Sequence, residues 1–158
     1  MITQSDNVIS LVDGSVGLRY ALIPVQCCGI AVATVARMLD PHGAGFARTL
    51  HPQEPLPCGA LPVLLTETTL YGAVCAEHML RSWPTSLPRP WLVLIADAPV
   101  RPAPAARYRF RALHSRLAGT ARVPYLPALR AVEGADEALE HKDVQTAAER
   151  LRRTLEGK

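Results

Sequence analysis

Two adjacent thiols, Cys27 and Cys28, stand between an uncharged apolar stretch and a stretch with helical periodicity. A thiol at the N-terminus of a helix has a lowered pKa, which favours the nucleophilic thiolate. A catalytic thiol also needs a partner base, and none of the five histidines is tied to this pair by sequence. Two interpretations stay open: small buried thiols, which we favour, or a thiol-dependent enzyme that uses Cys27 or Cys28.

The same segment has the layout of a phosphate-binding strand, loop and helix. The strand-like Tyr20–Val25 leads into a small-residue loop, and helical periodicity begins at about Ala31. A P-loop of this layout carries a lysine for the β- and γ-phosphates, followed by a Ser or Thr hydroxyl for Mg²⁺. Val32 and Ala33 hold those two positions, and Ala31 stands where a glycine is expected. The segment therefore predicts a phosphate loop without the groups that hydrolysis needs.

Some groups that attract phosphate remain. They are the backbone amides near Gly29, the Thr34 hydroxyl and the positive end of the helix dipole. Asp97 follows the most apolar run of the chain, where an ATPase carries an acidic residue, although a strand-end Asp commonly accepts loop N–H bonds instead. The candidate cofactor-binding residues are Cys28, Gly29, Ile30, Ala31, Val32, Ala33, Thr34 and Asp97.

Arginines gather around a helical segment between residues 101 and 116. Arg101, Arg107 and Arg111, with Tyr108 beside them, are candidates for contact with nucleic-acid phosphates or with a protein partner. The competing interpretation is a solvated helix face, which the net charge of only +3 favours.

Metal binding and membrane insertion are not expected. The spacing of His42, His51 and Cys58 in one long loop matches no common zinc pattern. The uncharged run from Tyr20 to Ala36 is short for a membrane span and contains a proline. The four cysteines form no regular framework, so we expect reduced thiols in a cytoplasmic protein.

Alternating strands and helices must position these residues. Such alternation is typical of an α/β domain with a mainly parallel sheet and helices on both faces. Strands are expected at 20–25, 62–66, 91–96 and 121–125, helices at about 31–39, 70–83, 105–118 and 137–155, and a long loop at 41–61. Ligands of such sheets bind beyond the carboxyl ends of the strands, which here comprise residues 26–31, 66–69, 97–101 and 124–130.

The side chains expected on the buried face of the 70–83 helix are Leu70, Val74, Cys75, Met79 and Trp83. Three regions are expected along the chain. Residues 1–19 form an N-terminal arm or edge strand, residues 20–132 form the α/β domain, and residues 133–158 form a C-terminal helix that packs on the domain or extends from it.

The order of these pieces resembles the ParA/MinD-like branch of P-loop ATPases, in particular a short divergent group from actinobacteria encoded near mobile elements. The matching pieces are the loop 27–34, the helix end Leu39-Asp40-Pro41, and the later segments PVLLTET, LVLIADAP and ARVPYLPALR. The resemblance implies a P-loop NTPase-like fold with a degenerate loop. In that family an acidic residue holds Mg²⁺ through water, yet no Asp lies between Pro41 and Thr66.

These losses predict a non-catalytic pseudo-ATPase that acts as a binding or scaffold module. The resemblance adds an expected setting in DNA transfer or partition of a mobile element, with a protein partner or the DNA-transfer machinery. The alternative is a protein that still binds ATP or GTP weakly at the degenerate loop; otherwise no cofactor is expected. The oligomeric state stays open.

Overall fold

A five-stranded sheet forms the centre of the chain, whose computed structural model describes residues 17–27 and 29–157. Most of the expected N-terminal arm therefore lies outside the described residues. The sheet has the order β2-β1-β3-β4-β5 and every neighbouring pair is parallel. The strands are β1 (Tyr20–Gln26), β2 (Ala47–Thr49), β3 (Leu61–Glu67), β4 (Trp91–Ile95) and β5 (Gly119–Val123).

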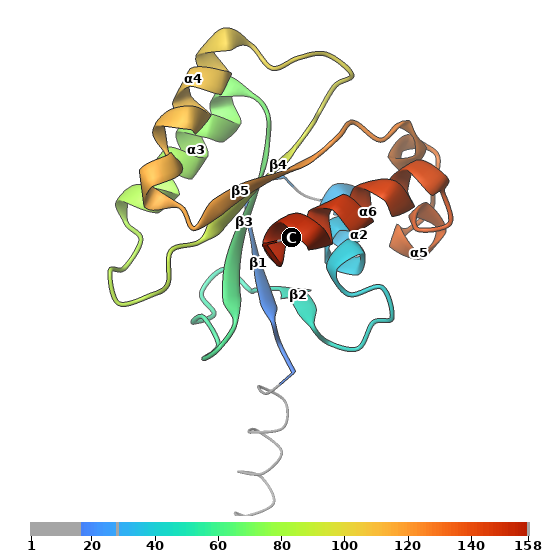
Figure 1. Cartoon of the computed structure of the whole chain (residues 1–158), viewed down its shortest axis with the longest axis horizontal. Coiled ribbons are helices and arrows are strands. Elements are labelled where there is room, and N and C mark those ends of the chain that lie inside the picture. The colour runs from blue at the N-terminus through green and yellow to red at the C-terminus, as the bar shows by residue number, and fades with distance from the viewer. Residues whose placement is uncertain (1–16, 28, 158) are drawn as a thin grey trace, which may run out of the picture.

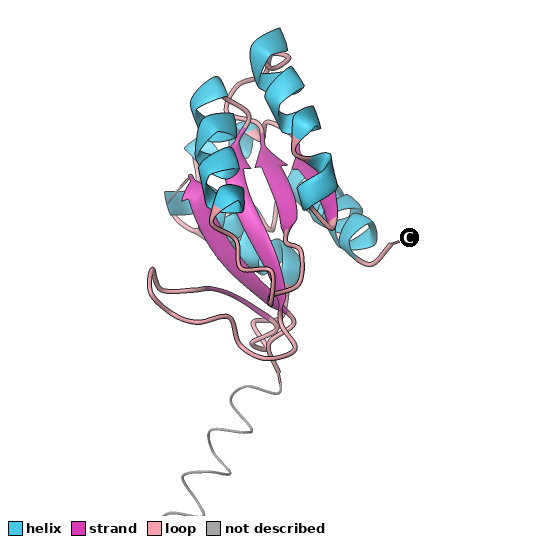
Figure 2. Cartoon of the chain, turned by 90° about the vertical axis from the view of Figure 1, so that its left-hand side faces the viewer, coloured by secondary structure: helices cyan, strands magenta, loops and turns pink. Residues whose placement is uncertain are grey.

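Helices cover both faces of this sheet (Figure 1, Figure 2). One face carries α2 (Gly29–Leu39), α5 (Ala135–Ala138) and α6 (Lys142–Leu155), and the other carries α3 (Leu70–Arg81) and α4 (Pro104–Ala112). The expected α/β class with a parallel sheet is confirmed. None of the helices in the described part of the chain is long and apolar enough to cross a lipid bilayer.

The central strands are buried on both faces, which explains their uninterrupted apolar sequence. In β4, Val93 and Ile95 face α2 and α6, whereas Leu92 and Leu94 face α3 and α4. The strand thus contributes to two separate core layers. Because side chains alternate along a strand, one short segment holds the helices of both faces.

Two expected elements have different bounds in the structure. The helix expected at 105–118 ends at Ala112 and continues as a 3₁₀ turn at His114–Arg116. The helix expected at 137–155 is divided into α5 and α6, because the chain at His141 is extended before α6 begins. The long loop expected at 41–61 contains the short strand β2, which apolar periodicity did not reveal.

The predicted buried face of α3 is wrong. Its buried residues are the small Gly72, Ala73 and Ala76 together with Leu80, while Leu70 is 45% exposed. A Cβ atom at Gly72 would lie 2.4 Å from the carbonyl oxygen of Glu67. The helix therefore approaches the sheet through its smallest residues, and its larger apolar side chains turn elsewhere.

Those larger side chains border an open groove beside β1. The connection from β2 to β3, residues 50–60, contains no helix, although parallel crossovers usually do. Val74, Cys75 and Met79 of α3 line the groove together with Val25 of β1. Where a crossover helix would lie, the loop residues Leu50 and Pro52 line an adjoining groove together with Met79.

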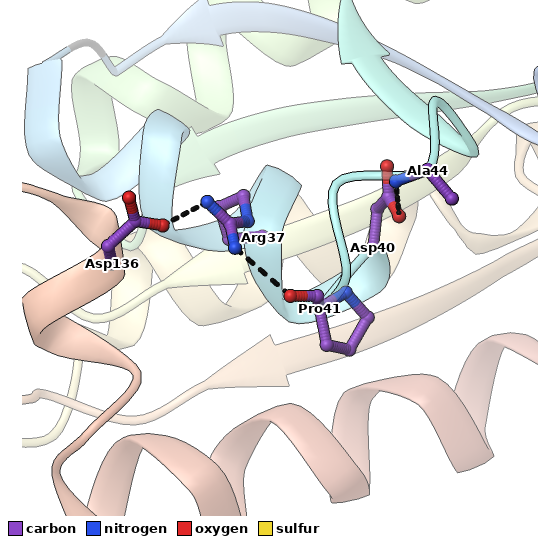
Figure 3. Close-up of polar contacts among 5 residues, drawn as sticks. All are labelled: Arg37, Asp40, Pro41, Ala44 and Asp136. Atoms are coloured by element: carbon purple, nitrogen blue, oxygen red, sulfur yellow. Dashed lines mark hydrogen bonds and ion pairs between the residues drawn. The ribbon is translucent and has the colours of Figure 1, made fainter.

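The C-terminal end of α2 is anchored by buried and bridging polar contacts (Figure 3). Asp40 is 4% exposed, and its carboxylate accepts hydrogen bonds from the backbone amides of Ala44 (2.8 Å), Gly45 (2.8 Å) and Phe46 (3.0 Å). Arg37 forms an ion pair with Asp136 of α5 and donates to the Pro41 carbonyl. These contacts fix the turn that ends α2 at Leu39, as the sequence predicted.

Candidate functional site

A cleft of about 350 Å³ opens at the carboxyl edge of the sheet. We call it the sheet-edge cleft. Each of the four segments expected at this edge contributes to it. The lining residues used below are Ile30, Ala31, Glu67, Asp97, Tyr125 and Arg130.

The strand order explains why the cleft forms here. The chain moves from β1 outward to β2, then returns to β3 on the other side of β1. Neighbouring crossovers therefore leave the sheet on opposite faces: α2 follows β1 on one face and α3 follows β3 on the other. The loops diverge at this point, and a crevice opens where doubly wound sheets bind their ligands.

The cleft combines apolar walls with a few polar groups of both signs. Ile30 and Ala31, from the first turn of α2, form part of its apolar lining. Glu67 follows from the end of β3, and Asp97 lies just beyond β4. Arg130 is exposed at the rim. Such a cleft suits a ligand that has an apolar part and a positively charged group facing the carboxylates.

Hydrogen bonds of the turn between β3 and α3 hold the acidic side of the cleft. The Thr68 hydroxyl donates to a carboxylate oxygen of Asp97 at 3.1 Å, which supports the interpretation of Asp97 as an acceptor for loop groups. Thr69 caps α3 by accepting from the amide of Gly72 at 2.9 Å. The β3–α3 turn is thereby fixed, so Glu67 and Asp97 are presented from rigid strand ends.

The residues expected in a phosphate loop do not form a loop in the structure, and they differ in exposure. Gly29 to Thr34 belong to α2 instead of a loop, and Cys28 lies outside the described residues. Val32 is buried, and Thr34 is 1% exposed with a hydroxyl oxygen that has no partner among the described residues. Of the candidate set, Ile30, Ala31 and Asp97 line the sheet-edge cleft, while Ala33 is exposed.

The thiol and metal hypotheses gain no support from the geometry. Cys27 is half-buried and packs against the core layer formed with α2 and α6. Within residues 17–27 and 29–157, no three His, Cys, Asp or Glu side chains lie close enough together to hold a metal ion.

The structure brings the three candidate arginines together. Arg101, Arg107 and Arg111 line one pocket of about 180 Å³ between α4 and β5. Arg122 of β5 lines the same pocket, as do His114 and Thr120. Arg122 was missed because its sequence context is that of an ordinary exposed strand position. We call this site the arginine pocket.

Comparison with protein-family models, curated protein sequences and solved structures found no match to this chain. The resemblance to ParA/MinD-like proteins therefore stays an expectation from the sequence, and function has to be argued from the sites themselves.

Proposed function

We propose that this chain is a non-catalytic binding module of ParA/MinD-like type, with the sheet-edge cleft as its ligand site. The proposal has two parts. The chain lacks the means to position a triphosphate for hydrolysis, and the cleft suits a segment of a protein partner. Each part has its own support.

The connection between β1 and α2 carries the first part. Only Cys27 and Cys28 separate the end of β1 at Gln26 from the start of α2 at Gly29. A P-loop uses a longer Gly-rich segment whose backbone amides surround the phosphates. Two residues are too few to form that cradle. Hydrolysis depends on such positioning and on a nearby cation, yet the side chain at Val32 is buried in the core.

The charge of the cleft supports the second part. Glu67 and Asp97 lie on the lining that a triphosphate would face, and like charges at short range repel. A peptide segment with apolar side chains and a Lys or Arg would satisfy both the walls and the carboxylates. The protein partner expected from the sequence therefore fits this cleft better than a nucleotide does.

Weak ATP or GTP binding remains the second candidate, and one observation favours it. The first turn of α2 borders the cleft through Ile30 and Ala31, and the free amides of a helix N-terminus attract phosphate. Arg130 at the opposite rim adds a positive charge.

A thermal-shift titration separates the two candidates. ATP, GTP and ADP are added with and without Mg²⁺ to the wild-type chain and to a Glu67→Gln, Asp97→Asn variant. A ligand at about 100 times its Kd adds about 2.7 kcal/mol, which raises the melting temperature by several degrees. We expect no rise for the wild-type chain at millimolar nucleotide.

Two results would contradict the proposal. Mg²⁺-dependent ATP turnover by the pure protein would exclude a non-catalytic module. The second is a clear rise in the wild-type melting temperature that is larger still in the variant without the carboxylates. This result would favour weak nucleotide binding over the proposed function. A rise in the variant alone would instead support the repulsion by Glu67 and Asp97 on which the proposal depends.

A further inference from the structure

The arginine pocket holds an unusual excess of positive charge. Arg101, Arg107, Arg111 and Arg122 line it, and none of their guanidinium groups forms an ion pair or side-chain hydrogen bond with another described residue. The Nε atom of Arg107 is buried without a partner among the described residues. No acidic side chain lines this pocket. Like charges gathered without counterions repel one another, so this lining favours a bound anion.

The walls of the pocket strengthen its field. Leu94, Phe110 and Pro102 form part of its lining, and low-dielectric walls around charges of one sign concentrate the field in a concavity. Thr120 adds a hydroxyl group that can donate a hydrogen bond to an anion, whereas the Thr68 hydroxyl already donates to Asp97. Guanidinium groups suit phosphate oxygens because they donate two parallel hydrogen bonds.

The positive surface continues over α4. Tyr108, which is 73% exposed, lies on this helix next to Arg107. It borders a second groove, of about 450 Å³, between α3 and α4, together with Arg81, Arg109 and Arg116. Glu77 neutralises part of that groove by accepting hydrogen bonds from Arg81 at 2.9 Å and from Arg109 at 3.2 Å. Arginines thus flank an exposed aromatic ring on both sides of one helix.

Basic and acidic residues are unevenly distributed along the chain. Residues 89–130 contain eight arginines and one acidic residue, Asp97, whereas residues 133–157 contain seven acidic residues and four Lys or Arg. The second region forms α5 and α6 on the opposite face of the sheet (Figure 1). The small net charge therefore conceals two faces of opposite character, and a polyanion would meet the α4 face.

We propose that the arginine pocket and the exposed face of α4 bind single-stranded nucleic acid, with backbone phosphates in the pocket and a base stacked on Tyr108. A polymer accounts for positive charge on both flanks of the helix, which one small anion would not span. An exposed aromatic ring favours a single strand, whose bases are free to stack. This surface adjoins the sheet-edge cleft at the Thr68–Asp97 hydrogen bond, but the two sites have different linings, and the inference does not depend on what the cleft binds.

Fluorescence anisotropy with a labelled oligothymidylate of about 20 nucleotides tests the inference. We expect micromolar affinity at low salt. If four arginines each contact a phosphate, log K should fall against log salt with a slope of about −3. The duplex of the same length should bind more weakly, because its bases are already stacked.

Matched variants locate the contact. Arg107→Ala, Arg111→Ala should raise Kd about tenfold or more and make the salt slope shallower by roughly one unit. Arg101→Ala, Arg122→Ala leaves α4 intact and should act in the same way, so the test still holds if the first variant unfolds.

Tyr108→Ala should raise Kd about tenfold, while Tyr108→Phe keeps the ring and should bind like wild type. Arg150→Ala, Arg153→Ala on α6 removes the same charge and should leave Kd unchanged.

Several results would overturn the inference. The first is no binding of the oligonucleotide at low salt. The second is an equal loss of affinity in the α4 and α6 variants, which would indicate attraction by net charge alone. Tighter binding of poly-glutamate or of vesicles rich in anionic lipid would assign the surface to an acidic protein or to a membrane instead.

Discussion

Asp40 is a buried carboxylate whose pKa is lowered by the fold. Burial raises the pKa of its carboxyl group, but the backbone amides of Ala44, Gly45, Phe46 and Ala47 outweigh burial, and the pKa lies below its ordinary value. A lowered folded-state pKa means that the unfolded chain binds more protons, so the stability that Asp40 contributes rises with pH. This contribution is complete above the ordinary value near 3.8 and is lost as the pH falls through the lower folded pKa.

Replacing this carboxylate should destabilise the chain in a pH-dependent way. Asp40→Asn turns one acceptor oxygen into a donor that faces backbone amides, and we expect a loss of about 2 kcal/mol at pH 7. The difference from wild type should shrink below about pH 4. Urea unfolding followed by circular dichroism measures both effects. Glu140→Gln, an exposed carboxyl, is the control. A difference that stays constant down to pH 2 would contradict this account of Asp40.

Gly72 packs so closely on β3 that a Cβ atom has no space there. A Cβ atom there would lie 2.4 Å from the Glu67 carbonyl oxygen and 2.6 Å from the Thr66 hydroxyl. Alanine improves helix propensity by about 1 kcal/mol, but forcing α3 off the sheet costs more, so we expect Gly72→Ala to lower stability by about 1–3 kcal/mol. Thermal unfolding measures the change. Gly134→Ala has open space around it and should be nearly neutral; a stabilised Gly72→Ala variant would disprove the tight contact.

At the scale of elements, the sequence predicts where strands and helices lie better than it predicts which face of a helix is buried. Strand runs such as WLVLIA are apolar throughout, so their position follows from composition alone. In α3 the large side chains suggested the buried face, but close packing selected Gly72, Ala73 and Ala76. Which residues are buried depends on how closely the helix approaches β3. The apolar periodicity of a helix or strand does not predict the distance between the two elements.

The helix-free crossover between β2 and β3 is held to β2 by an ion pair. Arg48 of β2 donates to Glu54 through two hydrogen bonds of 2.9 and 2.5 Å. The Arg48 contact is the main reason that the pKa of Glu54 is lowered to about 2. The pair therefore holds the crossover against the strand above about pH 4.5 and releases it as the pH falls toward 2.

Loss of this pair should loosen the edge of the sheet locally. In Glu54→Gln we expect faster amide hydrogen exchange in Ala47–Thr49 at pH 7, with β3 and β4 unchanged, because β2 is short and lies at the sheet edge. Exchange measured by mass spectrometry tests this, with Glu133→Gln as the control. Uniform acceleration across all strands would mean that the pair stabilises the whole fold instead.

At the scale of the whole molecule, the sequence predicted which edge of the sheet carries a cleft but not all of the side chains that shape the candidate sites. The rule for parallel sheets brought residues 26–31, 66–69, 97–101 and 124–130 to one cleft, and the structure agrees. Topology decides that outcome, and topology follows from the alternation of elements. The partners of Thr34 and the position of Arg122 depend on side-chain directions, which spacing alone did not supply. The net charge of +3 was equally uninformative, because it averages two faces that differ in sign.

The two-residue connection after β1 also bears on how this chain could change in evolution. On the proposed correspondence with a P-loop, Val32 stands where the lysine would be, and its side chain is buried among the core residues of α2 and α6. Val32→Lys would place an ammonium group in that core, where burial disfavours the charged form, instead of beside a phosphate. On this proposal, restoring the lysine alone would not restore ATP hydrolysis. On the same proposal, the chain would first have to gain residues between Gln26 and Gly29, so point mutation alone would give its descendants no gradual route to that activity.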